Sequence, residues 1–263
     1  MDQLRRYYRG ALRRMGRKLL AAGGEKGRGA RTVAEGWEQH ARRRPGETQL
    51  GDEWNDPAAK GLDVAKPEEV VPYLDRVVFA PFLGTCDVLL EIGPGAGRFT
   101  EILLPKCKKL IAVDTSKSML ALLRERFAGV EGIEYVESSG DGLAGVPDGS
   151  VDAAFSYGVF VHLQHWDIFN YMLELNRVLR PGGKAIIQHS NTFSELGWKK
   201  FRAEVPRQLN RHKLPFTFTV NSPDLMRELV TRAGLECVDT RTDVVRRDCI
   251  TLIRKPESVS TSG

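Results

Sequence analysis

Short apolar runs alternate with helix-like segments through the middle of the chain. The runs are five to seven residues long, as is typical of buried strands, and they occupy 88–92, 110–114, 133–137, 151–157 and 184–189. Between most of them, apolar residues recur with the spacing of an amphipathic helix, over 98–104, 116–127 and 168–179. Strands and helices in this order predict a parallel sheet with helices on both faces.

The pattern changes after the fifth run. Residues 191–220 mix aromatic and basic side chains without a clear period and predict an irregular insertion. The sequence NSPDLMRELV then predicts a helix with Ser222 as its N-cap and Pro223 in its first turn. GLECVDTRT and RDCITLIRK predict two strands joined by a short turn, and therefore antiparallel.

The N-terminal part is basic and has a different pattern. LRRYYRGALRRMGRKLLAA places apolar residues on one helical stripe among arginines. Such a helix could lie on a membrane or an acidic partner, and it could equally be solvated. Further helices are predicted near 33–43 and 68–79. The expected parts are a helical, partly flexible extension at 1–45, a main domain at 46–255 with a substrate lid at 191–220, and a disordered tail at 256–263.

Charge is distributed unevenly along the chain. The formal net charge is +5, but residues 1–44 hold 13 Lys or Arg against 4 Asp or Glu, and the remainder holds 26 against 30. A surface that coats nucleic acid is therefore not expected. The chain has no run of 18 apolar residues and no apolar leader, which predicts a cytoplasmic protein that could associate with a membrane through its N-terminal helix.

Three glycines, Gly93, Gly95 and Gly97, follow the first predicted strand. They let the backbone turn tightly and approach a ligand, and the following helix directs its free N–H groups at the same point. A structural turn without a ligand is the alternative. A nicotinamide dinucleotide would favour the spacing G-x-G-x-x-G, but here the third glycine comes one residue early.

Carboxylates around this loop distinguish the two cofactor classes. Glu91 precedes the glycines, where it would repel a pyrophosphate and attract the ammonium and sulfonium of S-adenosylmethionine. Asp114 ends the second predicted strand and could bind ribose hydroxyls in either class. With Asp141 after the third strand, these acids favour a cofactor without phosphate, namely S-adenosylmethionine.

Four segments in order, VLLEIGPGAGRFTEIL, LIAVDTSKSML, VPDGSVDAAFSYGVFVHL and LNRVLRPGGKAII, resemble the class I S-adenosylmethionine-dependent methyltransferases, in particular the small-molecule, type-11-like methyltransferase domain. The resemblance covers roughly residues 70–255. It implies an α/β, doubly wound, mostly parallel, Rossmann-like sheet of seven strands with an antiparallel last strand. It also implies a cofactor-binding set: Glu91, Gly93, Gly95, Gly97, Asp114, Thr115, Met119, Gly140, Asp141, Gly142, Ser156 and Tyr157.

Histidines supply the candidate bases. A hydroxyl acceptor needs a base near neutral pH, and an amine does not necessarily need one. His162 follows the fourth predicted strand and His189 ends the fifth, so both point to one crevice. A structural role is equally open for each. His165 is expected to flank the next helix, and Trp198, Phe201 and His212 in the insertion are the substrate candidates.

The sequence therefore predicts transfer of a methyl group from S-adenosylmethionine to a hydroxyl, less readily an amine, of a small molecule or glycan. SYGVF lacks the Asn/Asp-Pro-Pro-aromatic run of methyltransferases that act on bases, so DNA is not an expected partner. No metal is expected, because the cysteines, histidines and acids lack ligand spacing. The alternatives are a nicotinamide-dinucleotide oxidoreductase and a non-catalytic binding module with this fold; the oligomeric state is left open.

Overall fold

The computed structural model describes residues 35, 37, 38, 57–209 and 218–257. The chain divides into two units, 1–31 and 32–263, and every described residue lies in the second. Residues 35, 37 and 38 are helical, within the helix predicted at 33–43. The basic helix predicted near the N-terminus lies outside the described residues, and the predicted partition at residue 45 stays a prediction.

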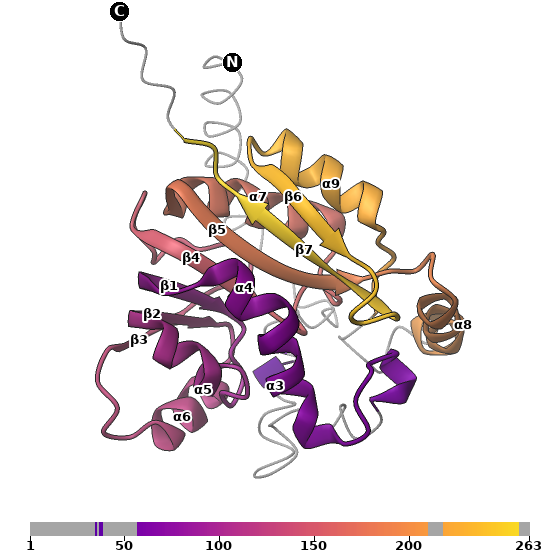
Figure 1. Ribbon diagram of the computed structural model, residues 1–263, viewed down its shortest axis with the longest axis horizontal. Coiled ribbons are helices and arrows are strands. Elements are labelled where there is room, and N and C mark those ends of the chain that lie inside the picture. Colours follow the sequence, from indigo (N-terminus) through magenta and orange to yellow (C-terminus); the bar gives the residue numbers. More distant parts are fainter. Residues whose placement is uncertain (1–34, 36, 39–56, 210–217, 258–263) are drawn as a thin grey trace, which may run out of the picture. The chain divides into compact units, whose positions relative to one another are not determined.

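Seven strands form one sheet in the order β3-β2-β1-β4-β5-β7-β6 (Figure 1). β7 is antiparallel to β5 and to β6, and the other neighbouring strands are parallel. This confirms the predicted fold class, including the terminal antiparallel hairpin. The strands are β1 (Cys86–Ile92), β2 (Cys107–Asp114), β3 (Ile133–Glu137), β4 (Val151–Ser156), β5 (Leu179–Ser190), β6 (Glu236–Arg241) and β7 (Asp248–Arg254).

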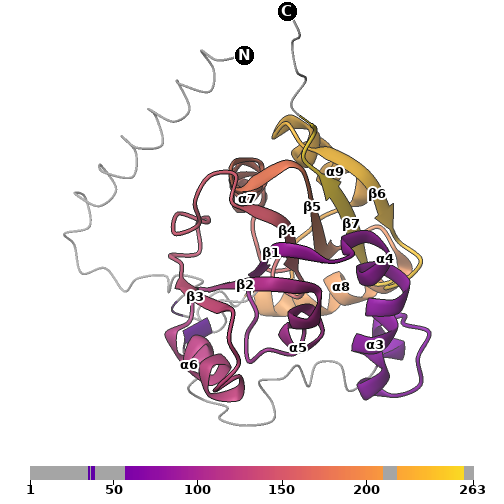
Figure 2. The same cartoon turned by 60° about the vertical axis from the view of Figure 1, so that its left-hand side comes forward.

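Helices cover both faces of this sheet, and the two views agree on their placement (Figures 1 and 2). Helices α7 and α9 lie on one face, where Ile92, Ile187 and Met172 are buried in a common core. Helices α3 to α6 lie on the other, over Leu89, Phe155 and other buried residues. The helices are α3 (Val70–Leu74), α4 (Ala80–Leu83), α5 (Thr100–Leu103), α6 (Lys117–Arg126), α7 (His165–Val178), α8 (Glu195–Leu209) and α9 (Pro223–Arg232).

Short helical turns complete the described elements. α3, a π-helical stretch at Asp75–Phe79 and α4 follow one another without a break, so the helix predicted at 68–79 extends to Leu83. Three 3-10 turns lie at Ala58–Lys60, Pro67–Glu69 and Leu104–Lys106. None of the helices described in the structure is both long and apolar enough to cross a bilayer.

Two elements differ from the sequence prediction. The insertion predicted to be irregular contains α8. Over 195–206, where the burial of side chains is described, the buried positions are Gly197 and Glu204 rather than apolar side chains, so no apolar period marks the helix. β5 begins at Leu179 instead of residue 184. Its early part is fixed by the antiparallel neighbour, since the Gly182 N–H donates to the Lys255 carbonyl at 2.9 Å.

The N-cap predicted for α9 is confirmed, and α6 has a second cap of the same kind. Ser222 accepts a hydrogen bond from the Leu225 N–H at 3.1 Å, and Pro223 is the first residue of α9. Ser116 caps α6 in the same way through the Met119 N–H, also at 3.1 Å. Both caps satisfy backbone donors that an isolated helix end would leave unpaired.

Candidate cofactor and acceptor site

The glycine loop joins β1 to α5 at the carboxyl edge of the sheet. All three glycines have positive φ, 70° at Gly93, 55° at Gly95 and 90° at Gly97. A Cβ at Gly93 would collide with Val159, so the loops after β1 and β4 pack directly together. A Cβ at Gly95 would meet no atom within 4 Å. The loop is therefore packed at its first glycine and open at its second, where a ligand can approach the backbone.

Glu91 is the buried acid of this site, with only 2% of its surface exposed. Thr100, on α5, donates its hydroxyl hydrogen to Oε2 of Glu91 at 2.6 Å. Burial is the main cause that raises the pKa of Glu91 to about 8; the Thr100 hydrogen bond opposes this shift, and the nearby Asp114 adds to it. A carboxyl that is this costly to ionise alone suits a site completed by a cationic ligand.

Asp114 ends β2 and faces the glycine loop. Its Oδ2 accepts the Gly95 N–H at 3.2 Å, and its Oδ1 accepts the Ser116 N–H at 2.9 Å. Burial raises the pKa of Asp114, these backbone hydrogen bonds lower it, and the Glu38 carboxylate raises it. The predicted ribose-binding acid thus lies beside the open glycine.

The remaining residues of the predicted adenine side follow β2 and β3. Gly140 has φ of 90°, and a Cβ there would come within 3.0 Å of the Thr115 methyl group. Asp141 accepts a hydrogen bond from Ser139, and its side chain is exposed. Gly142 lies next to it, and Met119 is buried on α6 with 6% of its surface exposed. Gly140 and Thr115, both predicted to lie on the adenine side of the cofactor, are therefore neighbours.

Ser156 and Tyr157 lie at the carboxyl end of β4. The Ser156 hydroxyl is fully buried and donates to the Ile92 carbonyl at 2.9 Å. The Tyr157 ring packs against Phe99, with ring centroids 4.7 Å apart. Both residues therefore pack against the end of β1 and the loop that follows it. Their direct contact with the cofactor stays a prediction.

His189 occupies a different environment from the one expected of a base. Its side chain is fully buried in β5; Nε2 pairs with the Thr251 hydroxyl at 2.8 Å and Nδ1 lies 3.0 Å from the Ser190 carbonyl. Burial lowers the pKa of His189 to about 4. This geometry favours a neutral structural imidazole that joins β5 to β7.

His162 keeps the position of a candidate base. It follows β4, is half-buried, and meets the edge of the Trp37 ring with centroids 5.2 Å apart. His165 starts α7, and its Nε2 lies 2.6 Å from the Val220 carbonyl, as expected for a residue that flanks the helix. No local sequence pattern marks Trp37, because the histidine that it contacts lies 125 positions later.

Glu38 and Gln188 are two further residues that the sequence analysis missed. Glu38 accepts hydrogen bonds from Ser116 and Ser118 at the start of α6. Gln188 accepts the Gly158 N–H at 2.7 Å and donates to the buried Asp248 at 2.8 Å. Gln188 thus fixes the loop after β4, where the methyl group and acceptor are expected to meet.

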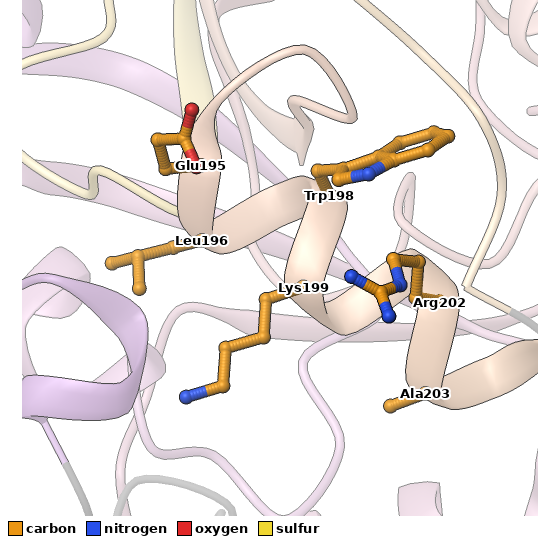
Figure 3. A pocket seen from close by; sticks show the side chains of 6 residues that line it. All are labelled: Glu195, Leu196, Trp198, Lys199, Arg202 and Ala203. Atoms are coloured by element: carbon orange, nitrogen blue, oxygen red, sulfur yellow. The ribbon is translucent and has the colours of Figure 1, made fainter.

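The predicted substrate residues lie on α8. Trp198 is 50% exposed and stacks on Phe201, with ring centroids 5.3 Å apart. A cavity of about 670 Å³ runs along this side of the helix, and Figure 3 shows its lining: Glu195, Leu196, Trp198, Lys199, Arg202 and Ala203. His212 lies outside the described residues. The buried side of α8, at Gly197, packs on Asn191 instead, so the cavity belongs to the outward side of the helix.

The described residues fit S-adenosylmethionine better than a dinucleotide. Glu91 and Asp114 place two carboxyl groups beside an open glycine backbone. An ammonium or sulfonium stabilises the ionised form of such groups, whereas a pyrophosphate would be repelled by it. Within 57–209 and 218–257, together with 35, 37 and 38, no group of three or more His, Cys, Asp or Glu is arranged to hold a metal ion.

Comparison with known proteins agrees with this geometry. Residues 90–187 match the family model described as a methyltransferase domain. The probable ribosomal RNA small subunit methyltransferase A of Methanosarcina acetivorans is 44% identical over 73 residues, 28% of this chain and 26% of that protein. The malonyl-[acyl-carrier protein] O-methyltransferase of a Marinomonas species is 36% identical over 118 residues, 43% of this chain and 42% of that protein.

The fold has relatives among solved structures as well. An S-adenosylmethionine-dependent methyltransferase from Methanosarcina mazei superposes with a TM-score of 0.56 at 15% identity, over 69% of this chain and 98% of that one. The chain spans less than half the length of the two curated relatives named above. The family match and the fold agree: residues 90–187 form a methyltransferase domain, and its cofactor is S-adenosylmethionine.

Proposed function

We propose that this chain transfers the methyl group of S-adenosylmethionine to a hydroxyl of a small molecule or glycan. The observation that carries the proposal is the half-buried imidazole of His162 beyond the carboxyl end of β4. Ligands of open α/β sheets bind at this edge. An imidazole there can take the proton that a hydroxyl loses as its oxygen attacks the methyl carbon.

Three observations support the choice of acceptor class. The open depression along α8 is lined by Trp198, Lys199 and Arg202, side chains that suit contact with a small polar or anionic molecule. The loop after β4 is SYGVF, without the Asn/Asp-Pro-Pro-aromatic run associated with base methylation. One relative is named an O-methyltransferase. An amine acceptor is less favoured, because it does not require a base at this position.

Ribosomal RNA is the second candidate acceptor, and the name of the relative from Methanosarcina acetivorans favours it. That match covers only 28% of this chain and 26% of the relative. The mildly acidic composition of residues 45–263, with 26 Lys or Arg against 30 Asp or Glu, opposes binding to a phosphate backbone.

An acceptor screen with labelled S-adenosylmethionine tests the proposal. Hydroxyl compounds, amines, oligosaccharides and a ribosomal RNA fragment are compared, with each product located by mass spectrometry. His162→Gln should lower kcat about 100-fold, the usual contribution of a general base, while the affinity for S-adenosylhomocysteine stays unchanged. Methylation of RNA alone, or of amines alone with His162→Gln fully active, would contradict the proposal.

A further inference from the structure

Two neighbouring residues, Trp37 and Glu38, contact loops on both sides of the glycine loop. Glu38 accepts hydrogen bonds from both hydroxyls at the start of α6, at 2.7 Å from Ser116 and 2.6 Å from Ser118, and from the Ser118 N–H at 3.1 Å. Trp37 meets His162 edge to face at 5.2 Å. α6 follows β2, whereas His162 follows β4.

The strand order shows what lies between these contacts. β1 separates β2 from β4 in the sheet. Neighbouring strands are about 4.8 Å apart, so the ends of β2 and β4 are about 10 Å apart. Two adjacent residues with long side chains can bridge that distance. The bridge then crosses the end of β1, where the loop from Gly93 to Gly97 begins.

The effect of Glu38 on Asp114 agrees with this position. The Glu38 carboxylate raises the pKa of Asp114, which requires the two acids to lie close together. Asp114 also accepts the N–H of Gly95, the glycine with open space around its Cα. Glu38 therefore lies beside the acid expected to bind the ribose, and its hydrogen bonds to α6 hold it there.

We propose that Trp37 and Glu38 form a cover over the cofactor crevice, which contacts bound S-adenosylmethionine and slows its release. Glu38 anchors the cover on α6, and the half-buried indole of Trp37 walls the crevice next to His162. The inference rests on the assignment of the cofactor and is independent of the acceptor. It makes Trp37 and Glu38 binding residues of the domain, although they precede the matched segment 90–187.

The test is the release of S-adenosylhomocysteine from the full chain, measured by stopped-flow displacement and by calorimetry. Trp37→Ala and Glu38→Ala should each raise the dissociation rate and the dissociation constant about tenfold, the effect of losing one capping or ring contact. Trp37→Phe should restore most of the affinity and remove the change in tryptophan fluorescence on binding. The matched controls are Trp166→Ala, whose ring is 80% exposed on α7, and Glu125→Ala, exposed near the other end of α6.

Three results would overturn the proposal. Two of them leave the cofactor assignment intact, and the third also contradicts that assignment. If the wild type binds but both alanine variants release the ligand at the wild-type rate, the cover alone is wrong. If the variants lose affinity only in proportion to their unfolded fraction, measured by circular dichroism under the same conditions, the contacts are structural and the cover is again wrong. If the wild type binds no S-adenosylhomocysteine, the cofactor assignment and the proposed function fail with it.

Discussion

Glu91 is expected to couple cofactor binding to pH. Its carboxyl, with a pKa of about 8 in the free protein, is mostly protonated at neutral pH. The ammonium group of the ligand favours the ionised form, so binding at pH 7 should release a proton, and affinity should rise from about pH 6 to pH 8. Calorimetry in two buffers of different ionisation enthalpy measures the released proton directly.

Glu91→Gln separates this coupling from simple loss of contact. The amide cannot ionise, so the variant should bind S-adenosylhomocysteine at least about tenfold more weakly at pH 9 and differ less at pH 6, where wild-type Glu91 is itself neutral. Glu101→Gln is the matched control, because Glu101 lies on α5 with a side chain that is 67% exposed. A wild-type affinity that does not change with pH would show that Glu91 is not the acid that meets the ligand.

His189 should link stability, rather than catalysis, to pH. Burial lowers its pKa from 6.5 to about 4, so the unfolded chain binds a proton more readily than the folded one between these values. The free energy of unfolding should therefore fall as pH drops from about 6.5 to about 4, by up to about 3 kcal/mol from this group. Above pH 6.5 the group contributes no slope.

His189→Gln tests both roles of this residue. Chemical denaturation at a series of pH values should show a shallower loss of stability for His189→Gln than for the wild type. Turnover of folded His189→Gln should stay within about threefold of the wild type, because an imidazole bonded to Thr251 and Ser190 does not face the acceptor. A 100-fold fall in turnover with the fold intact would instead restore its predicted role as the base.

Substitutions at two glycines of the loop should affect stability and cofactor affinity to different extents. At Gly97, φ is 90° and a Cβ would lie 2.6 Å from Leu123 and 2.5 Å from Phe127, so Gly97→Ala should cost about 2 kcal/mol of stability through strain and overpacking. At Gly95 only backbone strain opposes alanine, about 1 kcal/mol. The Gly95→Ala methyl group instead occupies space left for the cofactor. Thermal melts and calorimetry of both variants should show the larger loss of stability for Gly97→Ala and the larger loss of affinity for Gly95→Ala.

The sequence could predict those elements that apolar or glycine spacing marks. β1 to β4 carry apolar runs, and the glycine spacing marks the loop, so the sheet and the positions of Glu91 and Asp114 follow from local pattern. α8 could not be predicted because the positions it buries include Gly197 and Glu204, which show no apolar period. The helix α5 is two residues shorter at its start than expected, since the turn at Gly97 continues to Phe99.

At the scale of the whole molecule, contacts between distant segments escape any local pattern. Glu38 reaches Ser116 and Ser118 across 78 and 80 positions, and neither its own sequence context nor the N-cap of α6 identifies the partner. The early part of β5 likewise depends on Lys255, close to the end of the described chain. The glycine loop could therefore be predicted from the sequence, whereas the contacts of Glu38 with α6 could not.

Removal of residues 1–31 should separate the charge of the molecule from its cofactor site. This segment holds ten Lys or Arg and two Asp or Glu, so its deletion changes the formal net charge from +5 to −3. Every described contact of the site, including those of Trp37 and Glu38, lies in the unit that begins at residue 32. The deletion should therefore abolish retention on a cation-exchange column at pH 7 while the dissociation constant for S-adenosylhomocysteine stays within about twofold.

A deletion of residues 1–56, which also removes Trp37 and Glu38, should weaken binding about tenfold or more. Equal binding by the full chain and both deletions would show that residues before 57 take no part in holding the cofactor, whereas loss of binding on removal of residues 1–31 alone would place a binding determinant in the basic segment.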